Sequence, residues 1–111
     1  MTRSVSSDER QEVMIGSVPK ANFAENLNTV FRAARDEIVF EMELIEVLDR
    51  KSTPKQEQFS LFFRAPLDVP AEQGVFHIEH NLLPSGELFL VPVSGDERGL
   101  VFQAVFNRLI D

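Results

Sequence analysis

From Thr29 onward, the chain consists of short segments in which apolar and polar residues alternate, separated by polar turns that contain glycine or proline. A period of two residues is typical of β-strands that bury one face. The segments that we interpret as strands are 29–33, 38–48, 58–66, 75–80, 87–93 and 100–107. Because the connections are short and contain no long helical segment, the strands are expected to pair antiparallel. The predicted fold class is all-β, a small six-stranded antiparallel barrel or strongly curved roll.

The region before the first strand predicts one short N-terminal helix over residues 22–28. Asn22 can act as its N-cap, and Phe23 and Leu27 share an edge that should rest on the core. The residues before it, 1–20, are polar and predict a flexible N-terminal tail.

The break between the tail and the rest of the chain is marked by Gly16 and Pro19, so that residues 21–111 form a single β domain. Ser6 and Glu9 leave a second interpretation of the tail open, in which they form a capping box that starts one helical turn.

The segment 38–48 changes its apolar phase near its middle. The apolar positions include Phe40 and Leu44 in its first part and Ile45 and Val47 in its second. A slip by one residue is what a β-bulge produces, and bulges bend strands into barrels. Glutamate, methionine and leucine also favour helices, so a helix is the alternative interpretation of this segment.

The last four predicted strands carry a second apolar face. In the segment 58–66, Phe62 points away from the row formed by Phe59, Leu61 and Phe63. The residues of this face that we expect to form an interface are Phe62, Val75, Phe89, Val91 and Val101.

Three explanations of the second face stay open: the N-terminal segment folds over it, the domain is a two-layer sandwich, or a partner chain covers it. In the fifth strand, Leu88 and Leu90 compete with Phe89 and Val91 for the inward position. Pro92 cannot donate to a ladder, which predicts an edge position or a strand end.

Composition narrows the classes of partner. The 111 residues include ten Phe but no Tyr or Trp, so the aromatic side chains should serve packing. A net charge of −7 argues against nucleic acids and anionic membranes. No apolar run approaches the ~20 residues of a membrane span. The absence of cysteine and of a secretory signal makes a cytoplasmic location the default expectation.

Candidate chemistry is sparse. His77 and Glu79 share a strand face and should form a surface pair. His80 points elsewhere and should bond a turn carbonyl. A metal site needs three converging ligands, and these residues do not provide them. Glu41 and Glu43 share a face that should be solvated, in a domain too small for a substrate cleft. We therefore expect no catalytic residue, no cofactor, no metal site and no enzymatic activity.

Residues 59–107 resemble an uncharacterised bacterial family, a domain of unknown function. The family pattern runs "FSLxFRgP", "QGxYxLEH", "LFLVPV" and "YEAVFN", and this chain has "FSLFFRAP", "QGVFHIEH", "LFLVPV" and "FQAVFN" in the same order. The chain differs at Phe76 and Phe102, where Tyr is common, and in its longer polar N-terminus. The resemblance implies a small all-β protein and an association with phage-tail-like gene neighbourhoods.

The function predicted from these observations is a non-enzymatic structural or protein-interaction module, with a protein or a second copy of the chain as its partner. The resemblance narrows this to an accessory component of a phage-tail-like assembly. The alternative is a β-barrel that binds a small molecule in its interior.

Overall fold

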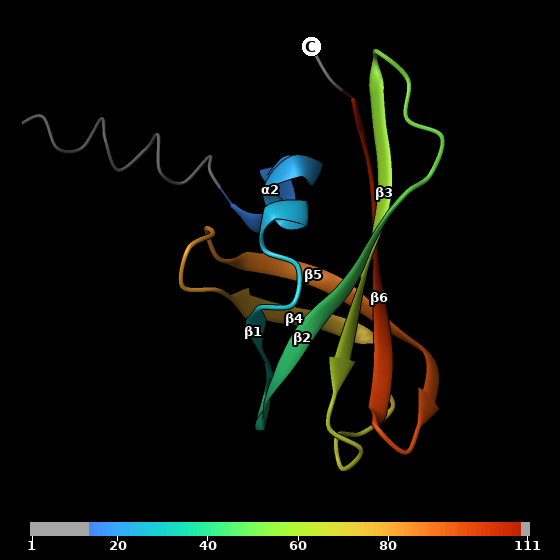
Figure 1. The fold of residues 1–111 in the computed structure, drawn as a ribbon. Coiled ribbons are helices and arrows are strands. Elements are labelled where there is room, and N and C mark those ends of the chain that lie inside the picture. Colours follow the sequence, from blue (N-terminus) through green and yellow to red (C-terminus); the bar gives the residue numbers. More distant parts are fainter. Residues whose placement is uncertain (1–13, 110–111) are drawn as a thin grey trace, which may run out of the picture.

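The computed structural model describes residues 14–109 (Figure 1). They form a 3-10 turn η1 (Ile15–Ser17), a helix α2 (Lys20–Glu25) and the strands β1 (Val30–Arg35), β2 (Ile38–Asp49), β3 (Gln56–Ala65), β4 (Gly74–Glu79), β5 (Gly86–Asp96) and β6 (Gly99–Leu109). The strands close into an antiparallel barrel in the order β1-β2-β3-β6-β5-β4. None of the helices in this range is long and apolar enough to cross a membrane.

The predicted fold class, an all-β six-stranded antiparallel barrel with one short N-terminal helix, is confirmed. The helical interpretation of 38–48 is wrong, because this segment is a strand along its whole length. Closure of the barrel, with β4 pairing with β1, also removes the two-layer sandwich as an explanation of the second apolar face.

The phase slip in β2 corresponds to a bulge, as predicted. The register of β2 against β3 shifts between Leu44 and Glu46, which leaves Ile45 as the extra residue. A second shift follows Pro92 in β5. β4 pairs with β5 only as far as Leu90, so Pro92 has a neighbouring strand on one side alone, although it lies within β5 and not at its end.

The barrel interior is filled mainly by aromatic rings. Phe59 and Phe106 stack with centroids 4.6 Å apart, and Phe31 meets Phe63 edge-on at 5.2 Å. In β5, Leu90 is buried and its neighbour Phe89 points outward, which settles the open question of the inward face. The alternation predicted for the barrel strands therefore holds.

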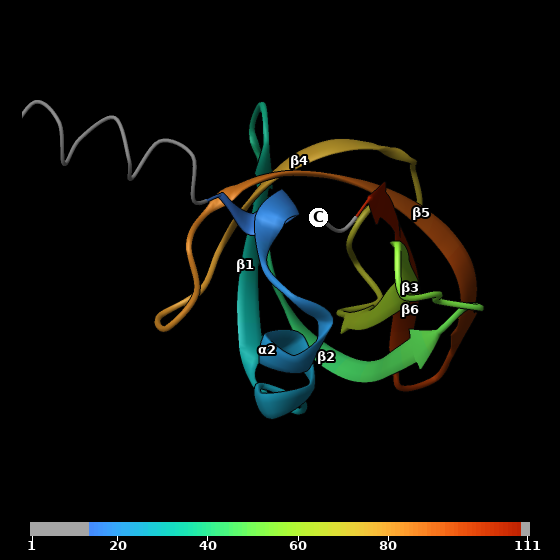
Figure 2. The same cartoon turned by 90° about the horizontal axis from the view of Figure 1, so that it is seen from above.

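The upper end of the barrel is covered by α2 and η1 (Figure 2). The helix begins at Lys20, with Pro19 as the N-cap residue, so the prediction of Asn22 as N-cap is wrong. The ring of Phe23 is buried against Phe59 and Phe106, with centroid distances of 6.0 and 5.4 Å. Phe23 is therefore the residue through which this edge of the helix packs against the core.

Leu27, the second residue of the expected helix edge, follows the last helical residue and is 42% exposed. Because the helix ends at Glu25, a residue four positions after Phe23 no longer lies beneath it on the same face. The prediction that Phe23 and Leu27 share an edge on the core is therefore correct for Phe23 and wrong for Leu27.

The contacts between the N-terminal region and the barrel begin at a lower residue number than the sequence predicted. Ile15 and Val18 are buried. Arg108 of β6 donates hydrogen bonds to the carbonyl oxygens of Gly16 and Val18 and forms an ion pair with Glu57 at 2.9 Å.

These contacts mean that a tail boundary at residue 20 is too late, because residues 15–18 belong to the folded unit. Residues 1–13, which include the expected capping box of Ser6 and Glu9, lie outside the described residues. Ile15 and Val18 belong to the core cluster, so this segment covers the barrel end.

Candidate interaction surface

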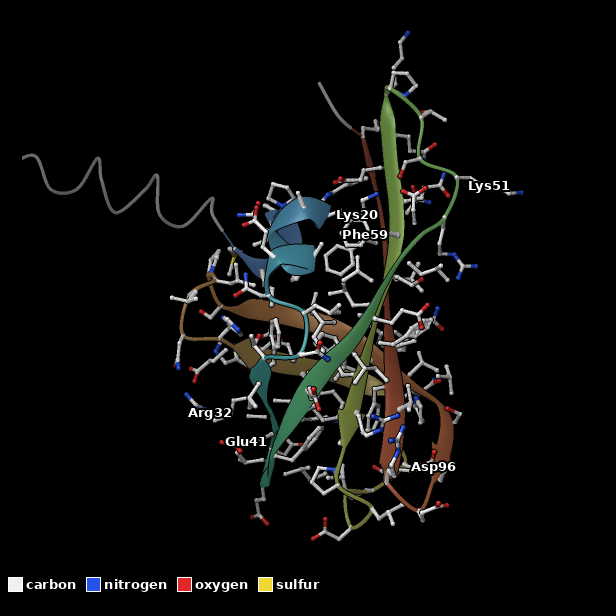
Figure 3. All side chains as sticks on the ribbon, in the orientation of Figure 1. Lys20, Arg32, Glu41, Lys51, Phe59 and Asp96 are labelled. Atoms are coloured by element: carbon white, nitrogen blue, oxygen red, sulfur yellow. The ribbon has the colours of Figure 1, made fainter. Side chains whose placement is uncertain are left out.

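One outward side of the barrel is charged. Arg32 of β1 lies opposite Glu41 of β2 and Glu79 of β4 in the ladders, and its guanidinium is 3.4 Å from the Glu79 carboxylate. Arg32 and Glu41 point away from the barrel in Figure 3, whereas Phe59 points inward. His77 pairs with Glu79 at 3.4 Å, as predicted, and also lies 3.5 Å from Glu87. This side is a solvated ion-pair network.

The neighbouring side, formed by β3, β6, β5 and the start of β4, carries apolar side chains, with Gln103 and Arg64 among them. The register aligns Phe62 of β3, Gln103 of β6 and Val91 of β5 in one row. Phe89 lies two residues before Val91 and pairs with Val75 of β4. Phe89 is 51% exposed and Val75 is 52% exposed, while Phe62 and Val91 are half-buried.

The fifth predicted interface residue, Val101, is half-buried and lies between Arg64 of β3 and Ser94 of β5. The structure thus brings all five predicted residues onto one outward face that spans four neighbouring strands. We call Phe62, Val75, Phe89, Val91 and Val101 the apolar outer face. Val105 of β6 extends it and is 63% exposed.

A buried hydroxyl lies next to this face. Ser60 points outward by strand parity, yet its side chain is fully buried. Its oxygen accepts hydrogen bonds from the Gln103 amide at 3.1 Å and from the Arg50 guanidinium at 3.4 Å. These bonds hold the side chains of Gln103 and Arg50 on the outward surface, where Gln103 lies opposite Phe62 and Ser60 lies opposite Val105.

His80 has a structural environment that differs from the expected bond to a turn carbonyl. Its Nδ1 accepts a hydrogen bond from the Leu82 backbone N–H at 3.0 Å, and its Nε2 lies 2.8 Å from the Thr29 hydroxyl. The Thr29 hydroxyl donates to the Asn26 carbonyl, so the neutral His80 ring carries its proton on Nε2. Burial lowers the pKa of His80.

The residues considered for chemistry do not converge. His77 and His80 belong to separate hydrogen-bond and ion-pair networks. Glu43 accepts a hydrogen bond from the Asn28 amide at 3.2 Å, while Glu41 is exposed. Within residues 14–109, no group of three or more His, Asp or Glu side chains could hold a metal ion.

The fold and surface define a class of protein: a small, aromatic-filled antiparallel β-barrel with one charged and one apolar outward side. Residues 18–106 match a domain of unknown function, DUF6916, and the chain belongs to this family. The match includes α2 and all six strands apart from the last residues of β6. Neither a search of the curated proteins nor a search of the solved structures returns a match.

Proposed function

We propose that this chain is a non-enzymatic interaction module that binds a protein through its apolar outer face. The single observation behind the proposal is the division of the barrel's outward surface into a charged side and an apolar side. Large contiguous apolar patches on the surface of a protein usually mark sites of association. Phe89, which lies beside Val75 and Val91, is the kind of aromatic anchor that protein interfaces contain, and Phe62 lies in the same row as Val91 with Gln103 between them.

The family resemblance gives the proposal a specific form, an accessory component of a phage-tail-like assembly. In such a role the barrel would act as a building block, with the buried interior providing stability and the outer face providing the contact. The partner is then either another protein of the assembly or a second copy of this chain.

The ring packing of the interior argues against the alternative of a small-molecule-binding barrel. A ligand cavity needs open volume and converging polar groups. The ring of Phe40 packs against those of Phe76 and Phe102 at centroid distances of 5.7 and 5.9 Å, and Phe76 also packs against Phe102. These rings therefore fill the part of the barrel interior in which a ligand would have to bind.

Photo-crosslinking in the native cells tests the proposal. Benzoylphenylalanine placed at Phe89 should give a discrete crosslinked protein, whose mass and sequence identify a partner or a second copy. The matched control is the same group at Leu82, which is 78% exposed in the loop after β4, outside the apolar outer face, and should give no discrete product. Equal products from both positions, or none from Phe89, would contradict the proposal.

A further inference from the structure

The barrel wall is interrupted between β2 and β3. The ladder between them begins with Glu43 opposite Arg64 and continues toward Asp49. Within the described range, residues 38–42 of β2 have ladder partners in β1 alone. Figure 1 shows the two strands side by side in the upper part of the molecule and separating toward the lower end. β2 therefore has an open edge over residues 38–42.

The backbone groups at this edge can be assigned. Leu44 makes both of its backbone hydrogen bonds to residues 28 and 29, at 2.7 and 3.1 Å, on the β1 side. Backbone groups of an antiparallel strand alternate between its two sides. The N–H and C=O groups of Val39 and Glu41 therefore face the gap. Among residues 14–109, no backbone hydrogen bond outside the strand ladders involves either residue.

Proline explains why the ladder stops. Continuing the register beyond Glu43 would place Glu41 opposite Pro66. Proline has no N–H and cannot complete that rung. The chain instead turns, with the Val69 N–H bonded to the Pro66 carbonyl at 3.2 Å.

The space beside the open edge is a groove. Two adjoining hollows of about 310 and 480 Å³ share Glu41 and Pro66 in their linings. The larger one is also lined by the exposed carboxylates of Glu37 and Asp68, and by Val69, which is buried. The groove thus combines free backbone groups and an apolar floor with an acidic rim at its larger hollow, while Arg64 and Arg98 line the smaller one.

The charge of the acidic rim indicates which kind of chain would bind in the groove. Pairing of this edge with the same edge of a second copy, centred on Phe40, would place Glu41 diagonal to Glu37 and Glu41 of that copy, and like charges at neighbouring positions are destabilising. An extended chain that carries lysine or arginine would meet opposite charges at Glu37, Glu41 and Asp68 instead. Exposed sheet edges bind such chains by adding a strand.

We propose that the open edge of β2 binds an extended basic segment of a partner protein by strand addition. This surface is separate from the apolar outer face and does not depend on its function. Backbone hydrogen bonds to Val39 and Glu41 supply the pairing, and the acidic rim supplies the preference for basic side chains.

The test is amide hydrogen exchange, followed by NMR, on the full chain with a blocked hexapeptide of alternating lysine and valine. In the free protein, the amides of Val39 and Glu41 should exchange quickly, while those of Phe40 and Met42 are protected. The peptide should slow exchange at Val39 and Glu41. Glu41→Lys should weaken binding by up to about fivefold, the range of one exposed ion pair, and Glu25→Lys on the helix is the charge-matched control.

A version of the peptide with its central valine replaced by proline separates strand addition from charge attraction. It keeps every lysine but loses a backbone donor, so it should not bind. The proposal is overturned if the proline peptide binds equally well, if Val39 and Glu41 are already protected in the free protein, or if no peptide binds. Phe62→Glu should leave peptide binding unchanged, which distinguishes this result from the outcome for the apolar outer face.

Discussion

At the scale of single residues, the polar side chains of Arg108 and His80 join parts of the chain that are far apart in the sequence. Arg108 joins β6 to the N-terminal turn and also lies over the rings of Phe59 and Phe106, at 5.3 and 5.4 Å from their centroids. His80 joins the end of β4 to Thr29, which is 51 positions earlier in the chain. Neither contact could be predicted from sequence, because nothing local in the pattern indicates a partner so far away.

His80 predicts a pH dependence of stability. The hydrogen bond from the Leu82 N–H requires an unprotonated Nδ1, and burial lowers the pKa of His80 below its ordinary value of 6.5. The unfolded chain therefore takes up the proton first as the pH falls. The contribution of His80 to the free energy of unfolding is fully present above pH 6.5 and is lost as the pH falls through the lowered pKa.

Chemical denaturation at a series of pH values measures this effect. His80→Asn keeps an acceptor for the Leu82 N–H but cannot titrate, so its stability should vary less steeply with pH over this range than that of the wild type. Identical slopes for the two proteins would show that His80 does not contribute to the pH dependence.

At the scale of elements, the N-terminal turn η1 and helix α2 act as a lid over the upper end of the barrel. Ile15 contributes a buried side chain close to Gly86, where an added Cβ would lie 2.9 Å from an Ile15 methyl group. Glycine at this position, with a φ of +157°, lets the turn approach β5 closely. The lid is part of the core and not an appendage.

Ile15→Ala should therefore lower the free energy of unfolding by about 2–4 kcal/mol, the usual cost of truncating a buried aliphatic side chain. The adjacent Met14 is 47% exposed, and Met14→Ala should change stability by less than about 0.5 kcal/mol. Urea denaturation compares the two variants. Equal, small effects would mean that the lid contributes little to the fold.

Some features of the strands could be predicted from the sequence, and others could not. The bulge in β2 was predictable because a change of phase is written directly in the residues from Leu44 to Val47. The neighbour of β3 was not, since β3 pairs with β6 through a full ladder from Gln56 to Ala65 that sequence periodicity does not specify. The open edge of β2 depends on that strand order and on the position of Pro66, so it became visible only in the structure.

At the scale of the whole molecule, strand parity separates the core residues from those of the outward surface. Inward residues such as Leu61 and Phe63 are fully buried in one aromatic core, and outward residues divide into a charged and an apolar side. Phe62, Val75 and Val101 were predictable because strand parity opposes them to the core, whereas the outward direction of Phe89 and Val91 became clear only from the burial of Leu88 and Leu90. Their continuity across four strands follows from the strand order.

The neighbouring residues Leu61 and Phe62 should respond oppositely to a charge. Leu61→Glu places an unpaired carboxylate in the core, where burial of a charge is costly, and should unfold the chain. Phe62→Glu places the same group on the outward, half-buried side and should leave a cooperative thermal transition. Circular dichroism compares the two, and unfolding of both variants would place Phe62 in the core.

The crosslink yield from position 89 in a Phe62→Glu chain tests the central claim, that the apolar outer face serves association, most directly. Burial of one phenylalanine contributes about 1.5–3 kcal/mol, so removing it should weaken the complex roughly 10-fold or more. We expect the crosslinked product to disappear while the circular dichroism spectrum of the purified variant stays that of the wild type. An undiminished crosslink in a folded Phe62→Glu chain would contradict it.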